Sequence, residues 1–422
     1  MNTSQQKKGY IRSTGIEIAS EVNKLMLHQK IAHKVRKVVV PGISLLIFFQ
    51  GCLILLFLQL TYKTLYCRND IRKQIGLNKT KRLFIVLVSS ILHVVAPSAV
   101  RITTENSSVP KGTFFLDLKK KRILSHLKSN SVAICNHQIY TDWIFLWWLA
   151  YTSNLGANVF IILKKSLASI PILGFGMRNY NFIFMSRKWA QDKITLSNSL
   201  AGLDSNARGA GSLAGKSPER ITEEGESIWN PEVIDPKQIH WPYNLILFPE
   251  GTNLSADTRQ KSAKYATKIG KKPFKNVLLP HSTGLRYSLQ KLKPSIESLY
   301  DITIGYSGVK QEEYGELIYG LKSIFLEGKY PKLVDIHIRA FDVKDIPLED
   351  ENEFSEWLYK IWNEKDALME RYYSTGSFVS DPETNHSVTD SFKINRIELT
   401  EVLILPTLTI IWLVYKLYCF IF

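Results

Sequence analysis

Three long apolar runs constrain this chain more than any other feature of its sequence. They extend from Val38 to Leu60, from Leu83 to Val100 and from Val402 to Phe422. The first and third have about the length that an α-helix needs to cross the hydrocarbon core of a bilayer. A soluble protein rarely carries three such stretches, so the sequence predicts membrane-embedded apolar helices at both ends of the chain.

The charge of the chain agrees with a membrane setting and argues against nucleic acid as a partner. Lys and Arg outnumber Asp and Glu by 54 to 38, which gives a net charge of +16, and nine residues are Trp. A basic, aromatic-rich chain suits either nucleic acid or an anionic membrane surface. Because its basic residues are dispersed and flank the apolar runs, we expect membrane phospholipids and no nucleic acid as partners.

The flanking charges leave the orientation of the first two runs open. Both runs have basic residues on both sides, so the positive-inside rule gives no clear topology. A hairpin buried in a single leaflet would keep every basic segment in the cytosol. Val38 lies too deep in the chain for a cleaved signal peptide, so we expect a retained anchor. The default location is the endoplasmic reticulum membrane, with the main domain in the cytosol.

The four cysteines exclude a disulfide framework. Cys52, Cys67, Cys135 and Cys419 are scattered along the chain, and Cys52 and Cys419 lie inside apolar runs. Their spacing fits neither paired disulfides nor a zinc site. We therefore expect a reducing compartment, no metal and no bound cofactor. Nothing in the sequence indicates an obligate protein partner.

Composition divides the chain into five parts. We expect a basic tail at 1–37, membrane helices at 38–100, an α/β domain at 101–378, a polar linker at 379–401 and a membrane helix at 402–422. Residues 202–240 mix Gly, Ser and Pro with charges of both signs, which predicts a flexible surface insertion within the domain.

Short apolar segments alternate with helical ones in the central part, which predicts a mostly parallel sheet flanked by helices. Leu333 to Phe341 alternates apolar and polar residues, as in a strand with one exposed face. Trp143 to Tyr151 and residues 350–378 are expected to be helices. The predicted buried strands are Ser131–Cys135, Asn181–Met185, Asn244–Phe248, Val277–Leu279 and Ile302–Tyr306.

The strongest candidate for chemistry is His137 with Asp142, directly after the predicted strand Ser131–Cys135. Five residues of continuous helix would place the two side chains about 140° apart. They can meet only if His137 lies in the turn before the helix and Asp142 reaches back from the first helical turn. The Asn, Thr and Asp residues at this junction are typical of a helix start.

His337 and Asp342 have the same spacing and provide an internal control. This second pair lies along the predicted strand Leu333–Phe341, where five residues extend about 16 Å. Its two side chains would point to opposite faces. We expect no catalytic pair there.

If His137 and Asp142 meet, the imidazole can act as a general base on a hydroxyl group, oriented by the carboxylate. The chain has no Gly-x-Ser-x-Gly elbow. Cys135 ends an apolar strand and is expected to be a buried filler. The attacking hydroxyl is therefore expected to come from a substrate.

Two further segments follow predicted strands. Phe248 to Asn253 reads Phe-Pro-Glu-Gly-Thr-Asn, in which a glycine allows close backbone approach and exposed amides can bind phosphate oxygens. Arg187 follows Asn181–Met185 and could grip a phosphate group. A plain β-turn and a solvated arginine are the alternatives. Pro280 closes the segment Val277–Leu279 at a comparable strand end.

Taken together, these segments resemble the glycerolipid acyltransferase family over about residues 120–375. Its four blocks match Asn136–Asp142, Phe182–Arg187, Phe248–Asn253 and Val277–Pro280 in the same order. The resemblance is strongest to the branch that contains 1-acylglycerol-3-phosphate, lysocardiolipin and lysophosphatidylinositol acyltransferases. It implies a glycerol-3-phosphate acyltransferase-like fold.

The resemblance also implies roles for individual residues. His137 would be the base and Asp142 its partner, while Arg187, Glu250, Gly251 and Thr252 would bind the acceptor phosphate. Pro280 would shape the acyl or CoA site, with acyl-CoA as co-substrate and lysophospholipids as acceptors. His281 departs from this branch, which usually has Arg there, so an anionic contact at that position is in doubt.

Several functions remain open at this point. A remodelling enzyme with a lysophosphatidylinositol-type acceptor is our first reading, and a 1-acylglycerol-3-phosphate acyltransferase is the alternative. A hydrolase would need a nucleophile or a positioned water. A non-catalytic lipid-binding protein would have no need to retain His137, Asp142, Glu250 and Arg187 together.

Overall fold

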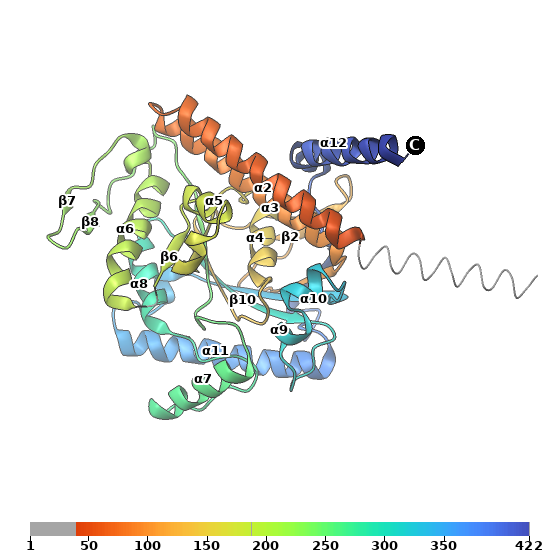
Figure 1. Cartoon of the computed structure of the whole chain (residues 1–422). Helices are drawn as coiled ribbons and strands as arrows, with labels where there is room; N and C mark the ends of the chain where they lie inside the picture. The colour runs from red at the N-terminus through yellow and green to blue at the C-terminus, as the bar shows by residue number, and fades with distance from the viewer. Residues whose placement is uncertain (1–38, 187, 422) are drawn as a thin grey trace, which may run out of the picture.

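The computed structural model describes residues 39–186 and 188–421, which form an α/β body with long helices along one side (Figure 1). One sheet of eight strands runs through the body. As far as the described residues show, only the pairs β12–β1 and β11–β10 of this eight-stranded sheet are antiparallel, which confirms a mostly parallel sheet. In order across the sheet, the strands are β12 (Asn385–Ser391), β1 (Ala99–Glu105), β11 (Leu333–Phe341), β10 (Ser298–Tyr306), β4 (Ser131–Cys135), β9 (Asn244–Leu247), β5 (Val159–Lys164) and β6 (Ile183–Met185).

Helices cover both faces of this sheet. Every residue of β4 is buried, and alternate residues belong to opposite cores. Ala133 and Cys135 pack in one core with α3 (Asp70–Val95) and α4 (Asp142–Thr152). Val132 and Ile134 pack in the other core with α6 (Trp189–Ala207), α8 (Ser282–Leu292) and α11 (Glu351–Thr375). The expected helices at 143–151 and 350–378 are therefore confirmed.

The remaining elements are short connections around these layers. Two hairpins lie outside the main sheet. They are β2 (Phe114–Asp117) with β3 (Arg122–Ser125), and β7 (Arg220–Ile221) with β8 (Ser227–Ile228). The short helices are η2 (Lys165–Ser169), α5 (Leu173–Asn179), η3 (Ser212–Ala214), α7 (Ala256–Lys268), α9 (Gly315–Ile318), α10 (Leu321–Phe325) and η4 (Val343–Asp345).

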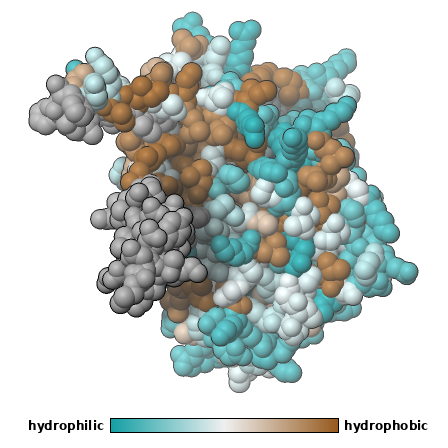
Figure 2. Space-filling model, turned by 90° about the vertical axis from the view of Figure 1, so that its right-hand side faces the viewer, coloured by the Kyte–Doolittle hydropathy of each residue, from teal (hydrophilic) through white to brown (hydrophobic). Residues whose placement is uncertain are grey.

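The three apolar runs have different surroundings. α2 (Val40–Leu65) is the one helix among the described residues that is long and apolar enough to cross a membrane. It packs on α3 and α5, while large side chains such as Phe49 and Phe57 stay exposed. α12 (Arg396–Ile421) packs against α2 and α3 and exposes Trp412. Figure 2 shows apolar surface gathered in the upper part of the molecule.

The second run is buried inside the protein. Ile85, Val86 and Leu87 are fully buried, and α3 ends at Val95. Residues 99 and 100 already belong to β1, so this run comprises the end of a core helix and the start of a strand that pairs with β11 and β12. The prediction of membrane-embedded helices at both ends is therefore not confirmed. The basic tail at 1–37 lies outside the described residues.

Some expected elements are wrong in detail. β11 exposes no face, because its polar residues Asp335 and His337 are paired with Arg101 and Glu105 of β1. Val277–Leu279 is buried but forms no strand. The Leu279 N–H donates to the hydroxyl of Ser262 at 2.8 Å rather than to a neighbouring strand.

Two expected connections contain regular structure. Residues 202–207 continue α6, and Arg208 fixes the following segment by donating to the Asn230 carbonyl oxygen at 2.8 Å. The proposed linker at 379–401 holds β12, which pairs with β1 along its whole length, and the first turn of α12.

Candidate active site

The site lies where β4 passes into α4, at the edge of the sheet where the parallel strands β4, β9, β5 and β6 all end. Asn136 shapes this edge from a fully buried position. Its side-chain amide donates to the Ile304 carbonyl oxygen at 3.1 Å and accepts from the Ile304 N–H at 2.8 Å. The Asn136 side chain thus replaces backbone hydrogen bonds between β4 and β10 at this point, so the next residue, His137, can leave the sheet.

His137 and Asp142 meet as the sequence predicts. Nδ1 of His137 lies 2.8 Å from Oδ2 of Asp142, which is the first residue of α4. The same carboxylate oxygen accepts the backbone N–H groups of Gln138 at 2.7 Å and Ile139 at 3.0 Å. Since an ionised carboxylate can only accept, Nδ1 carries the imidazole proton and Nε2 is the free acceptor.

The sequence analysis missed Tyr306, the last residue of β10. Its hydroxyl donates to Oδ1 of Asp142, and both side chains are buried. Burial, followed by the negative charge of Asp142, raises the pKa of Tyr306 well above its usual value, so the phenol stays protonated as a donor. Every hydrogen bond of the buried carboxylate therefore comes from the protein and fixes its position. A polar residue ending a buried strand was the only available signal.

The control pair His337 and Asp342 does not form. Nε2 of His337 lies 3.3 Å from Oε1 of Glu105. The Asp342 carboxylate instead caps η4 by accepting the Lys344 N–H at 3.0 Å. The prediction that equal spacing gives no pair within a strand is confirmed.

The turn after β9 packs directly on His137. The ring of Phe248 stacks on the His137 imidazole with centroids 4.3 Å apart. The Leu254 N–H donates to the His137 carbonyl oxygen at 2.8 Å, so the Phe248–Asn253 turn and the histidine turn form one unit. Gly251, at the exposed tip of this turn, has a φ of +71°, which glycine adopts without strain. Thr252 is half-buried beside it.

Glu250 points into the protein. It is buried and accepts the His137 N–H at 3.3 Å and the Trp362 indole N–H at 3.2 Å. Burial raises the pKa of Glu250 to about 8, and the donors from Trp362 and His137 oppose that rise. Trp362 comes from α11, so this helix takes part in holding the site.

A buried ion pair anchors α11 under β10. The ammonium group of Lys365 lies 2.7 Å from Oδ1 of Asp301 and donates to the Ile302 carbonyl oxygen at 2.6 Å. Arg339 of β11 donates to the other oxygen of Asp301 at 2.8 Å. Three elements are thereby fixed relative to one another behind the site.

The segment after Val277–Leu279 closes the site from the side. The His281 N–H donates to the Pro249 carbonyl oxygen at 2.8 Å, and Pro280 between them is half-buried. A Cβ placed on Gly251 would lie 3.5 Å from Cδ2 of His281, so the imidazole borders the glycine.

Arg187 lies outside the described residues. Its neighbours are held by α6, because the N–H groups of Ser186 and Lys188 donate to the two oxygens of Asp192 at 2.8 and 3.0 Å.

Neither a protein nucleophile nor a metal site is evident in the part of the chain that the structure describes. Cys135 is fully buried, and burial raises the pKa of its thiol well above the usual value, which suits a core residue. No group of three potential metal ligands occurs among the described residues. Trp147 and Trp148 of α4 are buried core residues whose indole N–H groups donate to backbone carbonyls.

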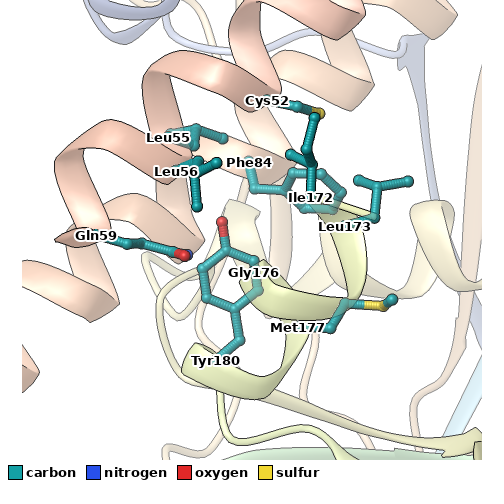
Figure 3. Close-up of a pocket in the computed structure, with 10 residues that line it drawn as sticks. All are labelled: Cys52, Leu55, Leu56, Gln59, Phe84, Ile172, Leu173, Gly176, Met177 and Tyr180. Carbon is teal, nitrogen blue, oxygen red and sulfur yellow. The ribbon is translucent and has the colours of Figure 1, made fainter. Parts of the chain in front are cut away.

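A separate, mostly apolar pocket lies between α2, α3 and α5 (Figure 3). None of the residues around His137 lines it. The hydroxyl of Tyr180 points into it near Gln59 and donates to the Thr80 carbonyl oxygen at 3.2 Å. The lining residues are Cys52, Leu55, Leu56, Gln59, Phe84, Ile172, Leu173, Gly176, Met177 and Tyr180.

A histidine–carboxylate pair at the edge of a mostly parallel sheet, beside a glycine turn and without a neighbouring nucleophile in the described part of the chain, is suited to activating the hydroxyl group of a substrate. Comparison with known proteins agrees with this class. The family model described as acyltransferase matches residues 100–307, and the model of the acyltransferase C-terminus matches residues 324–397. The chain belongs to the glycerolipid acyltransferase family.

Relatives share this assignment. An uncharacterized acyltransferase of Saccharomyces cerevisiae is 43% identical over 81% of this chain and 82% of its own length. A probable 1-acyl-sn-glycerol-3-phosphate acyltransferase of Arabidopsis thaliana is 29% identical over 62% of this chain and 58% of its own. Lysocardiolipin acyltransferase 1 of Gallus gallus is 30% identical over 58% of this chain and 54% of its own.

Proposed function

We propose that this acyltransferase moves a fatty acyl group from acyl-CoA to the free glycerol hydroxyl of a lysophospholipid. The observation that carries the proposal is the contact between His137 and Asp142 at 2.8 Å, with no protein nucleophile beside it among the described residues. Such a pair serves a reaction in which the substrate itself supplies the attacking oxygen.

The reaction proceeds by direct transfer. Nε2 of His137 takes the proton from the acceptor hydroxyl as its oxygen bonds to the thioester carbon, and the carbon–sulfur bond then breaks. The departing thiolate of CoA takes the proton from the imidazolium. Asp142 stabilises the imidazolium, and its hydrogen bonds to Tyr306, Gln138 and Ile139 keep it from turning away. General-base assistance of this kind contributes roughly 10²- to 10⁴-fold to the rate.

The acceptor phosphate is assigned to the exposed turn. Gly251 presents its backbone at the surface, with Thr252 next to it and Arg187 as the expected cationic partner. In this proposal Glu250 holds the turn, because its buried carboxyl oxygens already accept hydrogen bonds from His137 and Trp362. Pro280 positions the His281 segment beside the turn.

For the acceptor we favour a lysophosphatidylinositol-type lipid, as in acyl-chain remodelling, with 1-acylglycerol-3-phosphate as the alternative. The names of the relatives support a lysophospholipid acceptor in general, since they include a lysocardiolipin and a probable 1-acyl-sn-glycerol-3-phosphate acyltransferase. The exposed apolar side of α2 supports membrane association. We place the protein at the endoplasmic reticulum membrane, with the site in the cytosol.

The test is an assay of the purified full chain with one radiolabelled acyl-CoA and a panel of lysophospholipids. Labelled phospholipid is expected from the wild type and none from His137→Ala. Labelled free fatty acid alone would indicate a hydrolase. If the purified wild type yields neither product, and His137→Ala has no effect in cells, the protein is non-catalytic.

A further inference from the structure

α7 begins beside the catalytic histidine and carries dense positive charge. Leu254, two residues before the first residue of α7, donates to the His137 carbonyl oxygen at 2.8 Å. Residues 256–275 contain seven basic residues and a single acidic one, Asp257. A segment of this charge next to a reaction centre is suited to an anionic ligand.

The exposed face of this helix is a stripe of lysines around one aromatic ring. Lys261, Lys264 and Lys268 recur at helical spacing with Tyr265 among them, and all four are exposed. Ala266 is the one buried residue of the helix. Burial therefore contributes little to α7, and its outer surface is free to contact a ligand.

The lysines on and near this face differ in whether they form ion pairs. Lys271 and Lys275 form ion pairs with Glu356 and Glu370 of α11. Lys261 pairs within its own helix, with Asp257. Lys264 and Lys268 have no ion-pair partner within the described residues, so their charge is available to a ligand.

The stripe is continuous with the reaction centre. The ring of Tyr265, which is 45% exposed, lies 6.0 Å from the ring of His281. His281 in turn borders Gly251 in the turn that stacks on His137. A ligand that extends from the acyl carbon past His281 therefore reaches Tyr265 and the lysines.

The position of α7 argues against lipid as the ligand. In Figure 1, α7 lies on the opposite side of the body from α2 and α12, which carry the exposed apolar side chains. If those helices contact the bilayer, the lysine stripe faces water. Its ligand is then a soluble anion.

We propose that the outer face of α7, formed by Lys261, Lys264, Tyr265 and Lys268 together with His281, binds the phosphorylated nucleotide end of CoA. The inference rests on the proposed use of acyl-CoA. This end of CoA carries three phosphate groups and an adenine ring. Lysine ammonium groups bind phosphate, and an exposed aromatic ring offers a stacking face for a base.

The test compares Lys264→Ala/Lys268→Ala with a matched control, Lys119→Ala/Lys120→Ala, which removes two exposed lysines from the β2–β3 turn. Both are made in the full chain in lipid nanodiscs. The stripe variant is expected to raise the KM for acyl-CoA about 3- to 20-fold, as for two exposed ion pairs. Its kcat and its KM for the lysophospholipid should stay within about twofold of wild type. The control should change none of these values.

A second measurement uses the nucleotide without an acyl chain. Adenosine 3′,5′-bisphosphate should inhibit the wild type competitively with acyl-CoA and lose potency in the stripe variant by about the same factor. An unchanged KM and unchanged inhibition would overturn the inference while leaving the proposed function intact. An unchanged KM with weaker binding to phosphatidylserine-containing vesicles would identify the stripe as a lipid contact instead.

Calorimetric titration with CoA in the absence of acceptor separates this inference from the proposed function. A wild type that binds CoA more tightly than the stripe variant but forms no phospholipid would contradict the function and support the site. A wild type that binds no CoA would overturn both.

Discussion

His137 and His337 each precede an aspartate by five residues, yet one follows a strand and the other lies within one. The turn after β4 lets Asp142 reach back to His137 from the first residue of α4. In β11 the chain is extended, so His337 pairs across the sheet with Glu105 of β1. Both arrangements are polar pairs inside the protein. Only the first places an imidazole nitrogen at an open edge of the sheet.

The comparison shows that position within an element decides what a short spacing means. A junction between two elements can fold residues five apart onto one another, whereas a strand separates them by about 16 Å.

The largest difference is expected when each histidine is replaced. His137→Ala should lower kcat about 10²- to 10⁴-fold, because the general base is removed. His337→Gln should leave kcat within about threefold but lower the melting temperature, because a buried pair with Glu105 is lost. Both are measured by phospholipid formation from labelled acyl-CoA and by thermal unfolding. Equal losses of activity in the two variants would contradict the comparison.

The two glutamates beside these histidines should give opposite pH dependence of stability. The pKa of Glu250 is raised from near 4.5 to about 8 by burial, so its contribution to stability is complete below pH 4.5 and is lost as the pH rises through 8. The pKa of Glu105 is lowered, chiefly by its hydrogen bond to His337. Its contribution is therefore present above pH 4.5 and is lost as the pH falls through the lowered value.

In the wild type, the free energy of unfolding should therefore fall between pH 4.5 and 8. In Glu250→Gln this fall should be smaller by roughly 3–5 kcal/mol. Glu105→Gln should reduce only the loss of stability at acidic pH. Melting temperatures of both variants and of wild type across pH 4–9 provide the measurement. A decline in Glu250→Gln as steep as in wild type would show that another group titrates.

A smaller effect is expected at Tyr306. Tyr306→Phe removes one donor from the Asp142 carboxylate and should lower kcat about 10-fold, with the KM for either substrate unchanged. Tyr300→Phe, which removes a phenol at the other end of β10, serves as the control. If both variants lost activity to the same extent, Tyr306 would act only through the stability of the strand.

The smallest effect is expected at Asp342. Asp342→Ala removes the cap of η4 and should lower the free energy of unfolding by about 1 kcal/mol without changing kcat. Denaturant unfolding and the acyl-transfer assay measure the two quantities. Loss of activity here would mean that the second aspartate has a role that its position does not explain.

The sequence was sufficient where chemistry depends on neighbours along the chain. The contact between His137 and Asp142, the control pair, β4, α4 and α11 were all predicted correctly. Val277–Leu279 was wrongly expected to be a strand, because an apolar run reports burial and not the partner of its N–H groups. The exposed face expected for β11 was wrong because Arg101 and Glu105, far away in sequence, neutralise its polar residues.

What the sequence could not provide depends on register between distant segments. Tyr306 is 164 residues from Asp142, and Trp362 is 112 residues from Glu250. Local sequence indicates little about either residue, since Tyr306 is only a polar residue at the end of a buried strand and Trp362 belongs to an ordinary apolar pattern. Only the pairing of β10 with β4 and the docking of α11 bring them to the site.

The strand β10 sets the relative positions of several groups around the site. Along this one strand Asp301 meets Lys365, Ile304 meets the amide of Asn136, and Tyr306 meets Asp142. A shift of β10 by a single residue would break all three contacts, because it would move every residue of the strand to the opposite face of the sheet. β10 is parallel to β4 and antiparallel to β11, so such a shift would disrupt its pairing with both neighbours. The contacts that Tyr306 and Ile304 make with Asp142 and Asn136 therefore form only when β10 pairs with β4, whereas the contact between His137 and Asp142 is local to the turn after β4.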